Sequence, residues 1–460
     1  TGVINLRPGG VSAAGALTEL PDETIDVGSS SSEASGFVLS SVELGGIQSG
    51  YSALVIGSDQ HRGTIFVSAP TTFSGNVTLQ NTGSGGSLGG IQLNAPLTSA
   101  GTVVLASSGD IVQSGLNESP NASITASALL AHVPNSGAEV LLDRSPNLVN
   151  TLAVDPPATF RFYNDGPLTI GALSGTGFSA AGNTPTTITV TDSSSFGQFF
   201  VYAAGNLTLN RSISTLGPNP SSEPSIELVT GGFLTNNAGA GALSPFGGTR
   251  WTVWANTFVG ETRGGLDPGN AQPNLYGCAY PGSCVSDVAI PSTGNRFIYE
   301  QRPSVTVFAD DQLRAFGTAN PPLTITAVGL VNGDSPAGAL NGALTTSATQ
   351  FSPLGLYPID EAIPFASPVG YIVTFDPGRL GVEGLTPPHH GDETAASFGE
   401  TYIYDRNIGL PPMCVATGPL VVEAGTQGTD LLDVEWSRIR LKPNVTNCVA
   451  LSEGNTCKSF

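Results

Sequence analysis

Residues 52–131 decide the fold, because they consist of short apolar runs: SALVIGS (52–58), TIFVSAP (64–70), NVTLQN (76–81), GGIQLNAP (89–96), GTVVLAS (101–107), GDIVQSG (109–115) and ASITASALL (122–130). Each run is too short for a helix and is bounded by Gly, Ser, Asn or Pro, which is typical of strands separated by turns. The runs lie about 8–14 residues apart, so two strands fill about 20–25 residues, a repeat length typical of solenoids. Stacked coils bury a continuous core that one strand pair cannot bury alone. The stretch therefore predicts a rod of stacked parallel β-coils.

The same texture continues on both sides of this stretch. Before it, we expect a strand at Gly2–Leu6 and one or two helical turns that begin at Ser40 or Ser41 and end at Gly45–Gly46. After it come looser runs of the same kind: AEVLLDRS (138–145), ATFRFYNDGPLTIGAL (158–173), TTITVTD (186–192), QFFVYAAGNLTLN (198–210) and SIELVTGGFLTN (225–236). We therefore predict that the rod spans residues 1–237.

Residues 238–302 are predicted to form a cap or junction region. Its segment RWTVWAN (250–256) reads as a strand that bears an aromatic side chain on each face. Covering the open end of a rod, which otherwise exposes unpaired backbone, is the first interpretation. A platform on which sugars stack is the alternative.

The last third of the chain lacks the repeated short apolar runs of the predicted rod. Alternating strands at Ser304–Phe308, Leu323–Val328 and Tyr371–Phe375 predict a separate small β module over residues 303–383. Residues 384–412 read as a Pro-rich linker. The tail, 413–460, contains one helix candidate at Thr429–Arg440.

The composition limits the partners and the location. There are 36 acidic and 16 basic residues, and the formal net charge is −20. Such a balance argues against a nucleic-acid partner, because Lys and Arg bind the phosphate backbone. No run reaches the roughly 18 apolar residues of a membrane helix, and residues 1–20 lack the profile of a signal peptide. We expect a mature product or the C-terminal part of something longer.

The five cysteines form two closely spaced pairs with Cys414 left over. The pairs Cys278/Cys284 and Cys448/Cys457 predict disulfide loops, which point to an extracellular location. Between Cys448 and Cys457, Gly454-Asn455 supplies a turn that lets the chain double back. Further candidate modification sites are the N-x-Ser/Thr sequons, which begin at Asn76, Asn117, Asn121, Asn206, Asn210 and Asn444.

Several segments resemble filamentous-haemagglutinin-like exoproteins, which are exported by two-partner secretion. GVINLRPGGV (2–11), ALVIGSDQHRGTIFVSAP (53–70) and VVLASSGDIVQSG (103–115) are similar to the repeats of that family. GGTRWTVWANTFVGETRGGL (247–266), followed by GNRFIYEQRPSVTV (294–307), looks like the junction where its rod gives way to β modules. Residues 303–383 are similar to the MBG module of the YGX type, through RAFGTANPPLTITAVGLVNGD (314–334) and LGLYPI (354–359), although Phe316 replaces the usual Tyr.

The resemblance implies a right-handed parallel β-helix and a cell-surface or secreted location in a Gram-negative bacterium. It also implies adhesion or fibre formation, with an outer-membrane β-barrel transporter as secretion partner and a host surface, abiotic surface or glycan as the target. High-molecular-weight adhesins of this kind are glycosylated at sequons, and a Cys-closed C-terminal loop retains them at their outer-membrane partner. The matching loop here is Cys448–Cys457, flanked by Lys442 and Lys458.

Enzymatic motifs are poor, and we expect neither an enzyme nor a cofactor. Gly85-Gly86-Ser87-Leu88-Gly89 fits G-x-S-x-G but no helix follows it, and that motif needs a strand-to-helix turn. Asp59 and His61 are near in sequence, but no serine is singled out to complete a triad. His389-His390 lies in the Pro-rich linker. Asp310-Asp311 and Asp360-Glu361 are sequence neighbours on strands, where alternate side chains face opposite ways.

Three functions remain open at this point. The first is a structural and adhesive surface protein retained through its C-terminus. The second is a subunit of a self-assembling extracellular filament or surface layer, because an exposed rod end is a template for pairing. The third is a polysaccharide-degrading β-helix enzyme. Such an enzyme needs a cluster of Asp, Arg or Lys on one face of several successive coils, and residues 64–109 contain no Asp, Glu, Lys or Arg, which argues against it.

Overall fold

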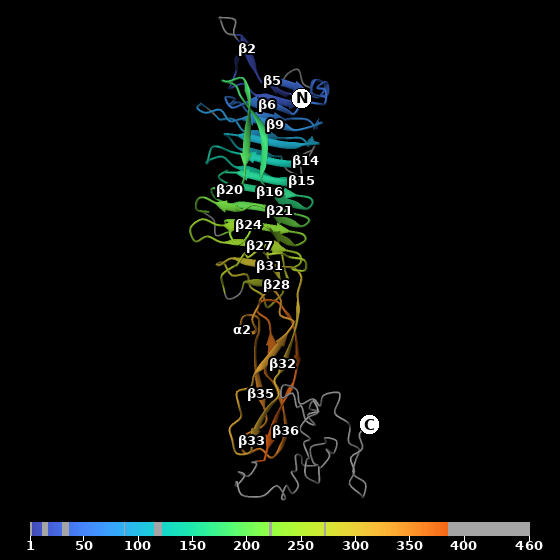
Figure 1. Cartoon of the computed structure of the whole chain (residues 1–460), viewed down its shortest axis with the longest axis vertical. Coiled ribbons are helices and arrows are strands. Elements are labelled where there is room, and N and C mark those ends of the chain that lie inside the picture. Colours follow the sequence, from blue (N-terminus) through green and yellow to red (C-terminus); the bar gives the residue numbers. More distant parts are fainter. Residues whose placement is uncertain are drawn as a thin grey trace, which may run out of the picture. The chain divides into compact units, whose positions relative to one another are not determined.

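The computed structural model describes residues 2–11, 17–29, 36–86, 88–114, 122–219, 223–270 and 273–384. Contacts divide the chain into two compact units, Thr1–Arg302 and Pro303–Phe460. In both units the described residues are almost entirely strands and turns (Figure 1). The fold is therefore all-β, as the sequence predicts.

The first unit is a parallel β-helix. One ladder of parallel strands runs through β1 (Val3–Leu6), β6 (Ala53–Ser58), β9 (Val77–Asn81), β12 (Thr102–Ser107), β14 (Ile124–His132), β15 (Val140–Asp155), β17 (Leu168–Ile170), β22 (Leu207–Leu209) and β25 (Leu234–Asn236). A second ladder runs through β5 (Phe37–Ser40), β4 (Ile25–Gly28), β7 (Ile65–Val67), β10 (Ile91–Leu93), β13 (Ile111–Gln113), β15, β16 (Phe160–Asn164), β21 (Phe199–Ala203), β24 (Ile226–Thr230), β27 (Trp251–Ala255), β31 (Arg296–Tyr299) and β28 (Asn274–Tyr276). Shorter ladders complete the coils: β8 (Thr71–Phe73) and β11 (Leu97–Ser99) continue into β14, and β20 (Ser193–Ser195), β23 (Ile213–Thr215) and β26 (Leu243–Ser244) pair with one another.

The register confirms the predicted stacking within residues 52–131. Leu54 lies beside Val77, and Val77 lies beside Val103, so each strand pairs with its counterpart one coil later. Asn76 bonds Ser52 and Thr102, which are 24 and 26 residues away, so the coil length here is close to the repeat of about 20–25 residues that the sequence suggests. Every second side chain points into the rod, and β-branched residues such as Ile91 and Ile111 are fully buried there.

One predicted coil strand is wrong. TTITVTD (186–192) does not stack into the rod but forms most of β19 (Thr184–Val190), which pairs antiparallel with β18 (Leu173–Ser179). This hairpin is the green pair of strands that runs across the coils in Figure 1. Its apolar side chains Leu173, Ile188 and Val190 pack on an outward-facing cluster that includes Val104 and Leu130. An alternating apolar pattern identifies a strand, but the hairpin shows that it does not identify the surface on which the strand packs.

The rod is also longer than the predicted 1–237. The interpretation of Trp251 and Trp254 as a cap is wrong, because β27 pairs in register with β24 as another coil strand. The ladder then continues from β27 to β31 and from β31 to β28. Although β28 precedes β31 in sequence, it pairs with the edge of β31 that faces away from β27. The Gly-rich turn before β27 misleads, because turns within a coil have the same composition as a domain boundary.

Two smaller elements flank the first coil strands. The helix α1 (Ser41–Gly45) confirms the predicted turns. Ser40 is the N-cap, its hydroxyl accepts from the Glu43 amide, and the Glu43 carboxylate accepts from the Ser40 amide. The strands β2 (Gly9–Val11) and β3 (Leu17–Glu19) form an antiparallel hairpin.

The second unit contains two small sheets. One has the order β34 (Ile325–Val328), β32 (Ser304–Ala309), β37 (Ile372–Asp376), close to the three strands predicted from the sequence. The other has the order β33 (Gln312–Ala315), β38 (Gly378–Glu383), β36 (Gly355–Ala366), β35 (Asn341–Thr346), and a short helix α2 (Pro336–Ala339) precedes β35. Ala309, Ala348, Ile359 and Leu380 form a buried apolar core of the second unit. The predicted linker and tail, from residue 385 onward, lie outside the described residues.

Candidate functional site

The sequons that the structure describes lie at exposed turns of the rod. The side-chain oxygen of Asn76 accepts from the amide of Thr102, and that of Asn206 accepts from the amide of Phe233, each in the next coil. Asn210 accepts from the Asn237 side chain in the same way. All three asparagines are exposed, so they are accessible to modification, but the coil-to-coil bonds account for them without it. Asn117, Asn121 and Asn444 lie outside the described residues.

The residues weighed for catalysis do not converge. Asp59 accepts from the amide of Ala180 at the hairpin tip, whereas His61 is fully buried. Asp310 accepts from the Thr326 hydroxyl, and Glu361 accepts from the amide of Phe365. Within the described ranges no three His, Cys, Asp or Glu residues gather as metal ligands, and Ser87, His389 and His390 are not in those ranges.

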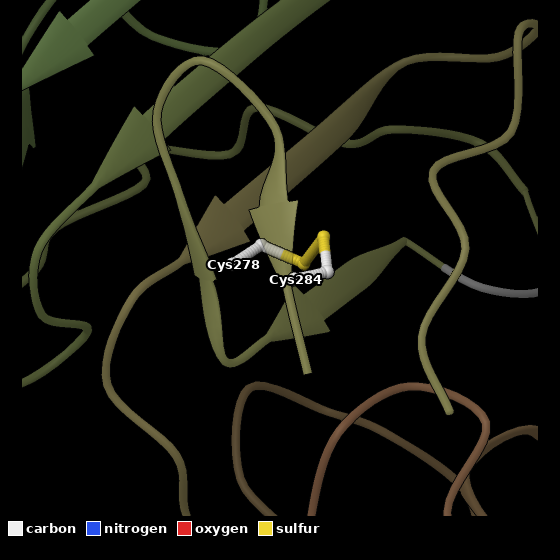
Figure 2. The surroundings of a disulfide bond; sticks show 2 residues. All are labelled: Cys278 and Cys284. Atoms are coloured by element: carbon white, nitrogen blue, oxygen red, sulfur yellow. A yellow bond between two sulfur atoms is a disulfide. The ribbon is translucent and has the colours of Figure 1, made fainter. Parts of the chain in front are cut away.

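Cys278 and Cys284 are joined by a disulfide between β29 (Cys278–Ala279) and β30 (Ser283–Cys284), as Figure 2 shows. The bond closes a tight antiparallel hairpin at the last coils of the rod. Tyr280 lies in the turn of this hairpin. Cys414, Cys448 and Cys457 lie outside the described residues, so the predicted C-terminal loop stays a prediction.

The disulfide hairpin packs on an aromatic surface of the second ladder. In β16, Phe160 and Phe162 are fully buried, so the alternation of the strand turns Tyr163 outward. Tyr202 occupies the same position on β21, and the two rings stack with centroids 4.8 Å apart. The Tyr280 ring lies 6.3 Å from the Tyr202 ring and 5.5 Å from the Trp254 ring. We call the half-exposed rings of Tyr163, Tyr202 and Tyr280 the tyrosine patch.

Charged groups border the tyrosine patch. The Arg161 guanidinium lies 4.4 Å from the Phe200 ring centroid and donates to Asp143 and Gln198. Glu227 is nearly buried and accepts from the Trp254 indole at 3.1 Å. Burial raises the pKa of the Glu227 carboxyl, and the indole bond only partly offsets that effect.

The environment of Tyr163 and Tyr280 favours the protonated hydroxyl. Partial burial, followed by the charge of Glu227, raises the pKa of Tyr280 to about 12. Burial also raises the pKa of Tyr163. Each hydroxyl can therefore both donate and accept a hydrogen bond.

Sequence reasoning located only part of this surface. It singled out Trp251, Trp254 and the disulfide, and it weighed a sugar platform at the tryptophans, but it missed Tyr163 and Tyr202. The signal was present, because FRFYN (160–164) and FFVYA (199–203) carry a tyrosine at the same place in successive coils. Alignment of the runs by coil would have placed one tyrosine above the other.

The molecule thus defines a class, a parallel β-helix followed by a small β domain. Comparison with known families identifies the small domain: residues 305–381 match the MBG domain of the YGX type. MBG domains occur in extracellular or surface proteins, which fits a surface adhesive role in general. No curated protein and no solved structure matches the chain. None of the helices in the described ranges is long and apolar enough to cross a membrane.

Proposed function

We propose that the chain is a non-enzymatic, structural and adhesive protein of a Gram-negative cell surface. In this proposal it is the C-terminal part of a large two-partner-secretion exoprotein related to filamentous haemagglutinin. An outer-membrane transporter exports it, and its C-terminus retains it at the surface. The observation that carries the proposal is the unbroken parallel ladder from β5 to β28, in a chain whose next domain is of a type found in extracellular proteins.

The rod suits adhesion for a physical reason. Stacked coils gain stability from nearest-neighbour contacts, and they present an extended, regular surface rather than one enclosed pocket. Described side chains on that surface use their polar groups to bond the next coil, as Asn76 and Asn206 do. A surface of this kind supports many contacts with a partner.

The test is attachment of the producing bacterium. Antibodies against residues 1–302 should label intact cells, and deletion of the gene should reduce attachment to host cells or to glass. Unlabelled cells, or deletion cells that attach as well as the parent strain, would contradict the proposal.

Retention at the surface is tested separately. The double variant Cys448→Ser/Cys457→Ser should release the protein into the medium, and antibody labelling of cells should fall in proportion. The matched control is Cys278→Ser/Cys284→Ser, which removes the other disulfide and should leave the protein on the cell. Unchanged retention after loss of Cys448 and Cys457 would leave that loop a structural staple.

A filament subunit is the second candidate function. Within the described residues, β1 pairs only with β6 and β5 pairs only with β4, so each has an edge available to another strand. Light scattering of purified protein distinguishes the two functions, because a filament subunit grows in mass with concentration and a monomeric adhesin does not.

A further inference from the structure

The tyrosine patch has hydrogen-bonding capacity that the protein itself does not use. The hydroxyls of Tyr163, Tyr202 and Tyr280 make no hydrogen bond to any group in the described part of the chain. By contrast, the hydroxyls of Tyr299 and Tyr371 bond Glu261 and Asp334. Tyrosine hydroxyls usually find a partner in a packed interior, and free ones on half-exposed rings are typical of binding surfaces.

The bordering charges also keep free capacity. Arg161 uses two of its N–H groups on Asp143 and Gln198, and a guanidinium has five. Only one oxygen of Glu227 accepts a bond from the Trp254 indole. Arginine and carboxylate groups beside half-exposed rings supply both donors and acceptors at the edge of an apolar surface.

This combination is suited to a sugar. The faces of pyranose rings carry C–H groups that pack on aromatic rings, and their hydroxyls need alternating donors and acceptors. The acidic groups Asp143, Glu223 and Glu227 all act on Tyr280, and they outnumber the positive charges at the border, which are Arg161 and, beside Glu227, Arg250. That surplus of negative charge repels sulfated or carboxylated glycans, so the charge favours a neutral one.

We propose that the tyrosine patch, with Arg161 and Glu227 at its border, binds a neutral polysaccharide. This proposal rests on the proposed adhesive function and names the partner of the rod. The disulfide has a specific role in it, because the closed hairpin holds Tyr280 against the coil strands that carry Tyr202 and Trp254. The site is therefore assembled from consecutive coils and one covalently closed loop.

Affinity electrophoresis of the full chain tests the proposal. Gels contain dextran, galactomannan, xylan or mixed-linkage β-glucan as neutral probes, and heparin or alginate as anionic ones. At least one neutral probe should retard the protein, and the anionic probes should not. Because Tyr202→Ala removes an aromatic contact, it should raise the apparent dissociation constant for the retarding polysaccharide about tenfold.

Two further variants separate binding from folding. Tyr202→Phe keeps the ring stack and should lose only part of the affinity, and Tyr163→Phe should behave in the same way. The matched control is Tyr51→Ala, which removes a tyrosine of the same rod whose hydroxyl lies near Ser74, away from the patch. Its mobility in every gel should equal that of the parent protein.

A spectroscopic readout accompanies the gels. Trp254 lies against Tyr280, so binding of the retarding polysaccharide should shift tryptophan fluorescence in the parent protein and not in Tyr202→Ala. The proposal is overturned if no neutral probe retards the protein, or if Tyr202→Ala and both Phe variants bind like the parent. If the polysaccharide site is refuted but cells that display the protein still attach to glass, the proposed adhesive function stands. If the protein is absent from the cell surface, both proposals fail.

Discussion

At the residue scale, buried asparagines replace the backbone partners that the coil corners lack. Asn164 is fully buried, and its side-chain amide donates to the carbonyls of Val149, Gly166 and Pro167. Its oxygen accepts from the Val149 amide. Asn81 serves three carbonyls at an earlier corner in the same way. Backbone carbonyls at these corners thereby gain hydrogen-bond donors, although the buried side-chain oxygen of Asn81 has no partner among the described residues.

Replacement of Asn164 by Ala should therefore destabilise the rod by about 1–3 kcal/mol, because buried backbone groups lose their partners. Asn206→Ala is the control, since Asn206 is exposed and water can replace its bond. Denaturant unfolding followed by circular dichroism measures both. Equal midpoints for the two variants would show that the corner bonds do not determine stability.

His61 makes the rod sensitive to mild acid. Its ring is fully buried, and neither ring nitrogen bonds any group in the described residues. Burial lowers the pKa of His61 to about 4, although the nearby Asp22 charge acts in the opposite direction. The unfolded state thus binds a proton near pH 6.5, and the folded state binds it only near pH 4.

The contribution of His61 to stability is complete above pH 6.5 and is lost as the pH falls to about 4, and the loss reaches about 3 kcal/mol at about 1.4 kcal/mol per pKa unit. Glu19, Glu227 and Glu261, whose pKa values burial raises, act in the opposite direction. The measurement is therefore a difference between variant and parent: His61→Gln should lose less stability than the parent as the pH falls from 6.5 to 4. Parallel curves would contradict the assignment.

At the element scale, the hairpin β18–β19 crosses several coils and forms hydrogen bonds with residues of more than one of them. The Thr78 hydroxyl donates to the carbonyl of Thr176, and the Gln80 side chain accepts from the amide of Phe178. Further along, Arg7 donates to Asn183. The hairpin thereby connects coils that are otherwise linked only to their neighbours.

Gly175→Val should displace the hairpin from the rod, since a Cβ at Gly175 would lie 2.2 Å from a methyl group of Val104. Hydrogen exchange should then rise for the amides of residues 173–190 while the coil strands stay protected. Thr189→Ala alters an exposed side chain on the same hairpin and serves as the control. Protection that is unchanged in Gly175→Val would mean that the contact relaxes at little cost.

The sequence predicts coil strands well, because the residues that fill the rod repeat along one face. The spacing of Ile65, Ile91 and Ile111, with turn residues between them, correctly predicts three stacked strands. It does not predict the hairpin or the full length of the rod. Both depend on which surface a strand packs against, and a strand such as β19 has the same alternation in either place.

The tyrosine patch was missed for a related reason, because it becomes visible only when the runs are aligned coil by coil. Tyr163, Tyr202 and Tyr280 are separated in sequence, and the coil register and a disulfide bring them together. A single run such as FRFYN gives no sign of its neighbour. Only the tryptophan strand β27 is conspicuous by itself, since two of the three tryptophans of the chain fall within it.

At the scale of the whole molecule, the division after Arg302 separates two kinds of architecture. The coils of the first unit depend on one another, whereas the second unit has two sheets around a core of its own. The buried Arg314 belongs to that unit alone and bonds Asn320 and the carbonyls of Thr349 and Gln350. A unit with its own apolar core and satisfied buried charge meets the requirements of an independent domain.

Residues 303–384 produced alone should therefore fold and unfold in one cooperative transition. The isoleucines of β36 supply a matched pair of variants, because Ile359 is fully buried and Ile363 is 62% exposed. Ile359→Ala should lower the free energy of unfolding by about 2–5 kcal/mol, since it removes buried methyl groups and leaves a cavity. Ile363→Ala should change it by less than about 0.5 kcal/mol, as is usual for surface substitutions. Urea unfolding of the fragment and both variants measures this. A fragment without a cooperative transition, or equal effects at the two positions, would show that the MBG domain takes its stability from the rod.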